Sequence, residues 1–273
     1  MYKDEKEFLK NYNPKKFEQL SMTADILLVS VASEKQDNYR KSNEKKMSIL
    51  LVKRDTYPYK DKWCLPGGFL NPVTETLEDT AKRILKSEVN LEDIYMEQLY
   101  TYDSIDRDPR CRVVSTAFIG LVDKTQLISD INPKASWFNI DFVQDDENGV
   151  IISLDNGKDK LLVQAKKNID KSSTRVNYEI IQNDNIAFDH ALVICTGIDR
   201  LRNKINYTDL VFYMMPKQFS LGDLQRVYEV ILNKKLLAPA FRRIIADKVE
   251  KTDVIQKGNG HRPSVMFTYK RNI

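Results

Sequence analysis

The chain has 273 residues, which is enough for one large domain or two ordinary ones. Hydrophobic residues make up 42% of it and charged residues 30%, a balance that excludes a disordered protein and allows a buried core. No run of about 18 apolar residues is present, so the sequence predicts neither a transmembrane helix nor a membrane partner.

The first part of the chain is polar and charged. MYKDEKEFLKNYNPKK lacks the apolar segment of a secretory signal, so we expect a cytoplasmic protein whose residues 1–21 form an arm that can be helical. The three cysteines, Cys64, Cys111 and Cys195, are odd in number and lack metal-ligand spacing. This pattern favours free thiols in a reducing compartment.

Strands and turns come next. Residues 24–32 and 47–54 are short aliphatic runs typical of strands, with a polar loop between them. The Pro-Gly-Gly within WCLPGGF, residues 63–69, breaks regular structure. Strands are also expected over 111–122, 136–140 and 149–155, the last ending in the turn Asp155-Asn156-Gly157.

Two helices complete this part of the chain. Apolar residues at helical spacing predict a helix over 76–89, and Thr76 with Asp79 forms a capping-box pattern at its start. A longer helix is expected over 190–205. Helices mixed with antiparallel strands place residues 22–207 in the α+β class.

The pattern changes at Tyr207-Thr208-Asp209. Residues 208–273 predict a helix, a turn, a second helix and a β-hairpin. Ser220 and Asp223 repeat the capping-box pattern, and Pro239 suits the first position of the second helix. We expect the buried face of that second helix to consist of Phe241, Ile244, Ile245 and Val249.

Charge is concentrated at the C-terminal end. Eleven Lys or Arg residues against five Asp or Glu residues give Phe219 to Ile273 a net charge of +6. The whole chain carries +4, so the rest carries −2. A basic segment on a slightly acidic body is typical of an appended nucleic-acid-binding module, although a solvated basic surface would look the same.

The segment GGFLNPVTETLEDTAKRILKSEVNL resembles the Nudix box. In that motif, acidic residues three and four apart on one helix face hold Mg²⁺ at a diphosphate. Here six residues instead of five separate the second glycine from Glu75, and Ile84 and Ser87 replace two of the glutamates. The positions that remain are Glu75, Arg83 and Glu88, of which Glu88 is the candidate metal ligand.

Such an eroded box implies a Nudix-like α/β/α sandwich in which no residue is assigned as catalytic. One carboxylate rarely places Mg²⁺, which usually binds one or two carboxylates together with substrate phosphate oxygens. The alternative is a metal-dependent Nudix hydrolase of a nucleoside diphosphate derivative such as ADP-ribose, with Mg²⁺ as its cofactor. An amphipathic core helix would also explain the pattern, with Asp79 and Arg83 forming a surface pair.

Two further stretches narrow the resemblance. IDRDPRCRVVSTAFIGLV, residues 105–122, and NIAFDHALVICTGIDRLRNKINYTDL, residues 185–210, resemble the Nudix-related transcriptional regulators of NAD metabolism. This resemblance implies that the pocket binds an NAD-related nucleotide such as ADP-ribose without cleaving it. The residues expected to bind the nucleotide are Arg54, Gly67, Gly68, Arg107, Arg110, Phe188 and His190.

Each of these residues also has a plainer interpretation. The three arginines are suited to bidentate contacts with phosphate oxygens, but each also suits a surface or capping role. A histidine at a helix start, such as His190, is more often a cap or a structural hydrogen-bonding group than a catalyst.

The C-terminal module resembles the winged helix-turn-helix of the same family. Arg242 and Arg243 lie on the second helix, which enters the DNA major groove in such modules. The wing would supply phosphate contacts, which set affinity without reading sequence. The expected DNA-binding residues are Ser220, Arg242, Arg243, Lys257, His261, Arg262 and Lys270.

The sequence therefore predicts a homodimeric, ligand-responsive transcriptional regulator. Its partners would be a double-stranded DNA operator and a nucleotide effector, and DNA binding would need no cofactor. Three alternatives stay open: the Nudix hydrolase, a regulator that binds a sugar or another phosphate compound, and a winged helix used only for dimerisation or protein contact.

Overall fold

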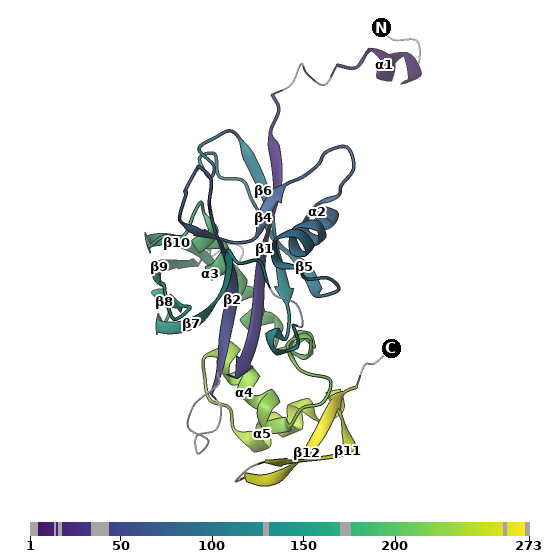
Figure 1. The fold of residues 1–273 in the computed structure, drawn as a ribbon, viewed down its shortest axis with the longest axis vertical. Helices are drawn as coiled ribbons and strands as arrows, with labels where there is room; N and C mark the ends of the chain where they lie inside the picture. Colours follow the sequence, from purple (N-terminus) through teal and green to yellow (C-terminus); the bar gives the residue numbers. More distant parts are fainter. Residues whose placement is uncertain are drawn as a thin grey trace.

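A computed structural model describes residues 5–13, 15, 18–33, 44–127, 131–169, 176–258 and 261–270 (Figure 1). Its centre is a ten-stranded mixed sheet in the order β10-β9-β8-β7-β2-β1-β6-β5, with β3 paired to β2 and β4 paired to β1. The strands are β1 (Ser21–Ser33), β2 (Lys45–Lys53), β3 (Trp63–Cys64), β4 (Gly67–Phe69), β5 (Tyr95–Tyr102), β6 (Val113–Leu121), β7 (Ala135–Asp145), β8 (Gly149–Asp155), β9 (Lys160–Ile169) and β10 (Val176–Asn183).

Helices cover both faces of this sheet. Successive side chains of a strand point to opposite faces, so alternate residues of β1 enter two different cores. Ala24, Ile26 and Leu28 pack with α2 (Leu77–Ile84), whereas Leu27 and Val29 pack with α3 (His190–Lys204). The predicted Nudix-like α/β/α sandwich is thereby confirmed.

The C-terminal module contains the predicted helices and hairpin. They are α4 (Leu221–Leu232), α5 (Ala238–Ile245), β11 (Val249–Gly258) and β12 (His261–Tyr269), preceded by the 3-10 helix η4 (Leu210–Met214). The Ser220 hydroxyl accepts the Asp223 N–H at 3.0 Å and caps α4. Phe219 and Phe267 exchange backbone hydrogen bonds of 3.0 and 2.8 Å, which tie the hairpin to the start of α4.

The apolar core runs without a break from the sheet into this module. One cluster joins Leu27 of β1 and Ile198 of α3 to Phe212 of η4 and Ile231 of α4. The division predicted between residues 207 and 208 falls between α3 and η4 and stays a prediction. In Figure 1 the module lies at the opposite end of the molecule from α1 (Glu5–Asn11).

The structure corrects two predictions about helices. The helix expected over 76–89 ends as α2 at Ile84 and continues as a π-helical turn, η2 (Leu85–Val89). Ile244, expected in the core, is 67% exposed, because Phe241 and Ile245 already form the buried face of α5. Val249 packs against the core, but from β11.

Other predictions concern smaller features. The capping box of Thr76 with Asp79 is present. Pro239 is the second residue of α5. The three cysteines are free thiols, with Cys64 and Cys195 buried. Among the helices of the described residues, none is long and apolar enough to cross a membrane.

Candidate functional site

The floor of the site lies where β4 pairs with β1. Asp25 of β1 is opposite Gly67 of β4 in an antiparallel register. A Cβ atom on Gly67 would lie 2.1 Å from Oδ1 of Asp25, so only glycine fits there without a shift. The N–H of Ile26 donates to the carbonyl oxygen of Pro66 at 2.8 Å and fixes the turn. The Pro-Gly-Gly turn therefore brings backbone close to a buried carboxylate.

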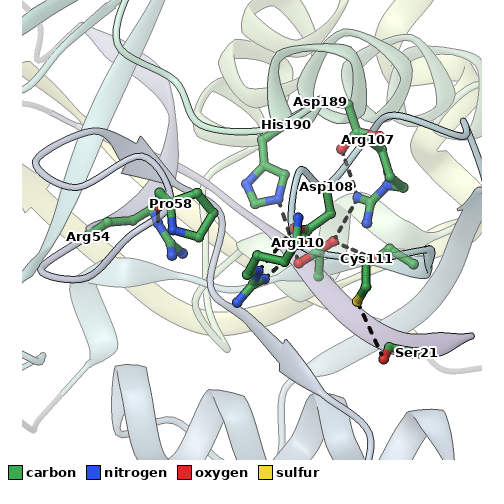
Figure 2. A network of polar contacts seen from close by, with 11 residues as sticks. Ser21, Arg54, Pro58, Arg107, Asp108, Arg110, Cys111, Asp189 and His190 are labelled. Carbon is green, nitrogen blue, oxygen red and sulfur yellow. Dashed lines mark hydrogen bonds and ion pairs between the residues drawn. The ribbon is translucent and has the colours of Figure 1, made fainter.

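Arg107 holds the site together from the loop between β5 and β6 (Figure 2). Its Nε and one terminal nitrogen donate to the two carboxylate oxygens of Asp189 at 2.9 and 2.7 Å. The same terminal nitrogen lies 3.4 Å from Oδ2 of Asp25, which also accepts the Ser115 hydroxyl. The Arg107 side chain is only 4% exposed. Two carboxylates thus compensate its charge, and the structure gives it a positioning role where the sequence suggested a phosphate contact.

His190 links the turn to the first residue of α3. Its Nδ1 accepts a hydrogen bond of 2.9 Å from the backbone N–H of Leu65. Its Nε2 lies 3.7 Å from Oδ1 of Asp25. Burial lowers the pKa of His190, an effect that the nearby Asp25 and Asp189 only partly oppose. The ring is therefore neutral, with its proton on Nε2 facing Asp25, which fits the structural interpretation of this histidine.

Two arginines at the mouth of the site stack on aromatic rings. Arg54 donates from Nε to the carbonyl oxygen of Pro58 at 2.8 Å, and its guanidinium lies 4.9 Å from the ring centre of Phe188. Arg110 pairs with the carboxylate of Asp108 at 3.0 and 2.7 Å and lies 5.0 Å from the ring of Phe69. Such stacking and pairing fix the planes of both guanidinium groups.

Phe188 occupies an unusual backbone conformation. Its φ of 54° is in the left-handed region, which is rare for a bulky residue and costs about 1–3 kcal/mol. The centre of its ring lies 4.8 Å from the ring centre of Tyr59 and 5.3 Å from that of His190. Strain of this kind is found at functional sites, because the surrounding structure must hold the residue in place.

These residues line one cavity of about 250 Å³, here called the cationic pocket. All seven residues expected to bind a nucleotide lie in its wall, although they come from distant parts of the chain. The complete lining is Thr23, Asp25, Arg54, Thr56, Cys64, Leu65, Gly67, Gly68, Phe69, Arg107, Asp108, Arg110, Phe188 and His190.

A second cavity of about 480 Å³ adjoins the cationic pocket and shares Arg107 and Phe188 with it. We call it the tyrosine cavity, because four tyrosines line it. These are Tyr59, Tyr100, Tyr102 and Tyr178. Asp103, Asp106 and Asp189 also line it, so aromatic residues and acidic residues share the wall of this cavity.

Sequence reasoning missed Thr23 and Asp25. Both are buried on β1, and the hydroxyl of Thr23 has no hydrogen-bond partner among the described residues. A signal was available, because Asp25 interrupts the aliphatic run ADILLVSVA and Thr23 precedes it by two residues, on the same face of a strand. A charged residue inside a buried strand indicates a site.

The helix of the Nudix-like motif uses its remaining charges for structure. Arg83 donates to the Glu75 carboxylate and, at 3.0 Å, to the carbonyl oxygen of Phe69. The hydrogen bonds that the Glu75 carboxylate accepts, first from Arg83 and then from the Asn71 N–H and the Thr80 hydroxyl, lower the pKa of Glu75 to about 2. The surface pair between Asp79 and Arg83, which the alternative of an amphipathic core helix implied, is absent: Asp79 caps α2 and Arg83 holds the preceding loop.

The same helix offers little to a metal ion. Ile84 is 1% exposed and faces Gly68, on which a Cβ atom would lie 3.4 Å from Ile84 Cδ1. Burial raises the pKa of Glu88, whereas Arg54 and Arg83 act in the opposite direction. No group of three His, Cys, Asp or Glu side chains that could hold a metal occurs among the residues that the structure describes. The donors around Glu88 do not fit a Mg²⁺ site.

The second surface of interest is the exposed side of α5. Arg242 and Arg243 are both exposed there. Lys270 is exposed beside the hairpin, and its N–H donates to the carbonyl oxygen of Lys248 at 2.9 Å. The Ser220 hydroxyl serves as a helix cap. The backbones of Lys257, His261 and Arg262 belong to β11 and β12, whereas their side chains lie outside the described part of the chain.

Similarities to known proteins cover both modules. Residues 211–269 match the family model of the NrtR DNA-binding winged helix domain, and residues 39–152 match that of the NUDIX domain. A curated relative, the ADPR responsive transcriptional repressor NtrR of Acinetobacter baylyi, is 30% identical over 271 residues, which is 98% of this chain and 89% of the relative.

Two solved structures share the fold over almost the whole chain. A MutT/nudix family protein from Enterococcus faecalis superposes with a TM-score of 0.72 at 23% identity, covering 98% of this chain and 94% of that one. Shewanella oneidensis NrtR complexed with a 27mer DNA gives a TM-score of 0.62 at 24% identity, covering 91% of this chain and 93% of that one.

Proposed function

The chain belongs to the NrtR family of Nudix-related, DNA-binding transcriptional regulators, and we propose that it represses transcription in response to ADP-ribose held uncleaved in the cationic pocket. The observation that carries this proposal is a contrast within one site. Arginines gather at a pocket of the right kind for a diphosphate, while the neighbouring helix lacks the donors that a catalytic Mg²⁺ needs.

Arg54 and Arg110 are the groups that we assign to the diphosphate. Each guanidinium is oriented by an aromatic ring and by one hydrogen-bonded partner, so little conformational freedom is lost when an anion binds. Arg107 plays a different part. It keeps Asp25 and Asp189 in place, and with them the wall of the pocket.

The size of the cavities supports a ligand that occupies both of them. The cationic pocket alone, at about 250 Å³, is smaller than the roughly 300–1,000 Å³ typical of small-molecule sites. The adjoining tyrosine cavity adds about 480 Å³. We assign the diphosphate to the cationic pocket and the remainder of ADP-ribose to the tyrosine cavity.

The A. baylyi relative is named for its response to ADP-ribose, and the S. oneidensis relative was solved with DNA. Both properties agree with the two surfaces of this chain. We propose a cytoplasmic homodimer, because a two-fold symmetric protein suits a pseudo-palindromic operator with half-sites about 10 bp or a multiple of 10 bp apart. DNA binding would require no metal, and EDTA is expected to leave it unchanged.

Thermal unfolding with a metabolite panel tests the ligand. ADP-ribose should raise the melting temperature, because it binds the folded state alone. Arg54→Ala should remove that increase. The control Arg112→Ala should keep it, because Arg112 is exposed and lines neither cavity. A sugar or another phosphate compound that raises the melting temperature while ADP-ribose does not would replace the proposed effector.

Product analysis tests the hydrolase alternative. The protein is mixed with ADP-ribose and Mg²⁺, and release of AMP is followed over time. We expect none above the background without protein. Turnover of about 1 s⁻¹ or faster, within the usual enzyme range, would make the protein a hydrolase.

A further inference from the structure

The exposed side of α5 carries an apolar stripe beside its arginines. Leu237, the residue at the N-cap position of α5, is 79% exposed, and Ile244 is 67% exposed. Ala240 is exposed between them. Their spacing of three and four residues places them on one side of a helix. We call Leu237, Ala240 and Ile244 the α5 stripe.

The core fixes the rotation of this helix. Phe241 and Ile245 are buried, at 4% and 0% exposure, and both face the module interior. At 3.6 residues per turn, Arg243 then points about 180° away from them, and Ile244 lies beside it. Arg243 therefore lies on the outermost line of the helix, the α5 stripe runs along one flank of that line, and Arg242 lies on the other flank.

A partner that fits this face must be anionic and must present apolar groups next to its charges. The DNA major groove has both properties, because the C5-methyl groups of thymine are exposed on its floor between the phosphate backbones. A stable protein interface usually buries about 800 Å² on each partner. Two large apolar side chains beside two arginines provide little of that area.

We propose that Ile244 contacts the C5-methyl group of a thymine in the operator, next to the base read by Arg243. The contact would make Ile244 a specificity-determining residue. This inference rests on the proposed DNA-binding function and adds to it a feature of the recognised sequence. It also explains why a large aliphatic side chain stays in water in the free protein.

Exchange of thymine for uracil tests the contact, because it removes that methyl group and keeps base pairing. Randomised duplex DNA selected with the full chain first supplies an operator duplex. Each thymine pair related by the operator symmetry is then replaced by uracil, and dissociation constants are measured by fluorescence anisotropy at one salt concentration. The proteins compared are wild type, Ile244→Ala, Ile244→Val and the control Ile169→Ala, since Ile169 in β9 is similarly exposed, at 62%.

At one thymine position, replacement by uracil should lower the affinity of the wild type roughly fourfold per half-site. This factor corresponds to the free energy of burying about one methyl group. Ile244→Ala should bind the thymine and uracil duplexes equally, with about the affinity of wild type for uracil. Ile244→Val should keep part of the difference, because it retains branched methyl groups. Ile169→Ala should behave as wild type.

Three results would overturn the inference. In the first, the wild type tolerates uracil at every position. In the second, Ile244→Ala stays as sensitive to uracil as the wild type. In the third, Ile244→Ala leaves every DNA affinity unchanged but alters the mass of the assembly, which would make the α5 stripe a protein interface. Failure of the wild type to select any DNA would instead remove the proposed function itself.

Discussion

Arg202 in the last turn of α3 donates a hydrogen bond of 2.8 Å from Nε to the backbone carbonyl oxygen of Ile231 in α4. The same side chain pairs with Asp145 of β7 and lies 4.1 Å from the ring of Phe142. The other end of α3 begins at His190 in the wall of the cationic pocket. One helix, roughly 22 Å long, thus joins the ligand pocket to the winged module.

Removal of Arg202 should weaken the response to ligand. If α3 transmits the state of the pocket, Arg202→Ala should reduce the effect of ADP-ribose on DNA affinity while leaving ADP-ribose affinity within about twofold of wild type. It should also lower the free energy of unfolding by about 1–3 kcal/mol, because hydrogen bonds to a charged group are removed. Anisotropy and urea unfolding measure the two quantities. An Arg202→Ala protein with an undiminished response would exclude this route.

Gly67 and Gly68 should respond differently to the same substitution. Gly67→Ala places a Cβ atom 2.1 Å from Asp25 Oδ1, and this overpacking should cost about 1–3 kcal/mol of stability and weaken ADP-ribose binding. Gly68→Ala is the matched control for stability alone, since its Cβ atom would meet Ile84 at an ordinary 3.4 Å but Gly68 also lines the cationic pocket. Urea unfolding separates the pair, and calorimetric titration measures ADP-ribose binding by Gly67→Ala. Equal tolerance at both positions would contradict the described packing around Asp25.

His190 should make the fold sensitive to mild acid. Burial lowers the pKa of His190 below its ordinary value of 6.5, so the unfolded chain takes up a proton that the folded chain rejects. Its contribution to stability is therefore complete above about pH 6.5 and declines as the pH falls below that value. Urea unfolding from pH 7.5 to 5.5 should show a shallower decline for His190→Asn than for wild type.

The comparison with wild type decides the assignment. If His190→Asn shows the same decline in stability between pH 7.5 and 5.5 as the wild type, the assignment of the buried neutral imidazole is incorrect.

The basic residues of the winged module should divide into two kinds. Arg242→Ala with Arg243→Ala should remove the preference for operator over unrelated DNA, because each arginine that reads a base contributes about 1–3 kcal/mol to that preference. Lys270→Ala should weaken binding to all sequences alike and reduce the slope of affinity against salt by about one. Competition binding at several salt concentrations distinguishes the two. A uniform loss from the paired arginine substitution would show that they contact phosphates.

Sequence predicted the main helices because they depend on local patterns, and the residues expected to bind a nucleotide do line one cavity. Motif residues such as Gly67, Arg107 and His190 lie on elements whose order in the Nudix-like fold is fixed, so the pocket follows once that fold is recognised. What sequence did not predict was how each charge is used. Arg107 pairs with Asp189, which is 82 residues away, and no local pattern specifies such a contact.

Two failures have a clear physical origin. Ile244 and Ile245 follow Phe241 at three and four residues, and both spacings suit a buried face, so only packing against α4 decides between them. The strands β9 and β10 were missed although Leu161, Val163 and Ala165 of β9 alternate as a strand requires, because the last four residues of β9 are mostly polar and the edge strand β10 has no buried residue.

The most direct test of the central claim is the fraction of operator DNA bound by the full chain as ADP-ribose is added. If the pocket and the winged module are coupled, saturating ADP-ribose should change the DNA dissociation constant by about 5- to 150-fold. An unchanged dissociation constant at an ADP-ribose concentration that saturates the pocket would contradict the claim that this chain is a repressor responsive to that nucleotide.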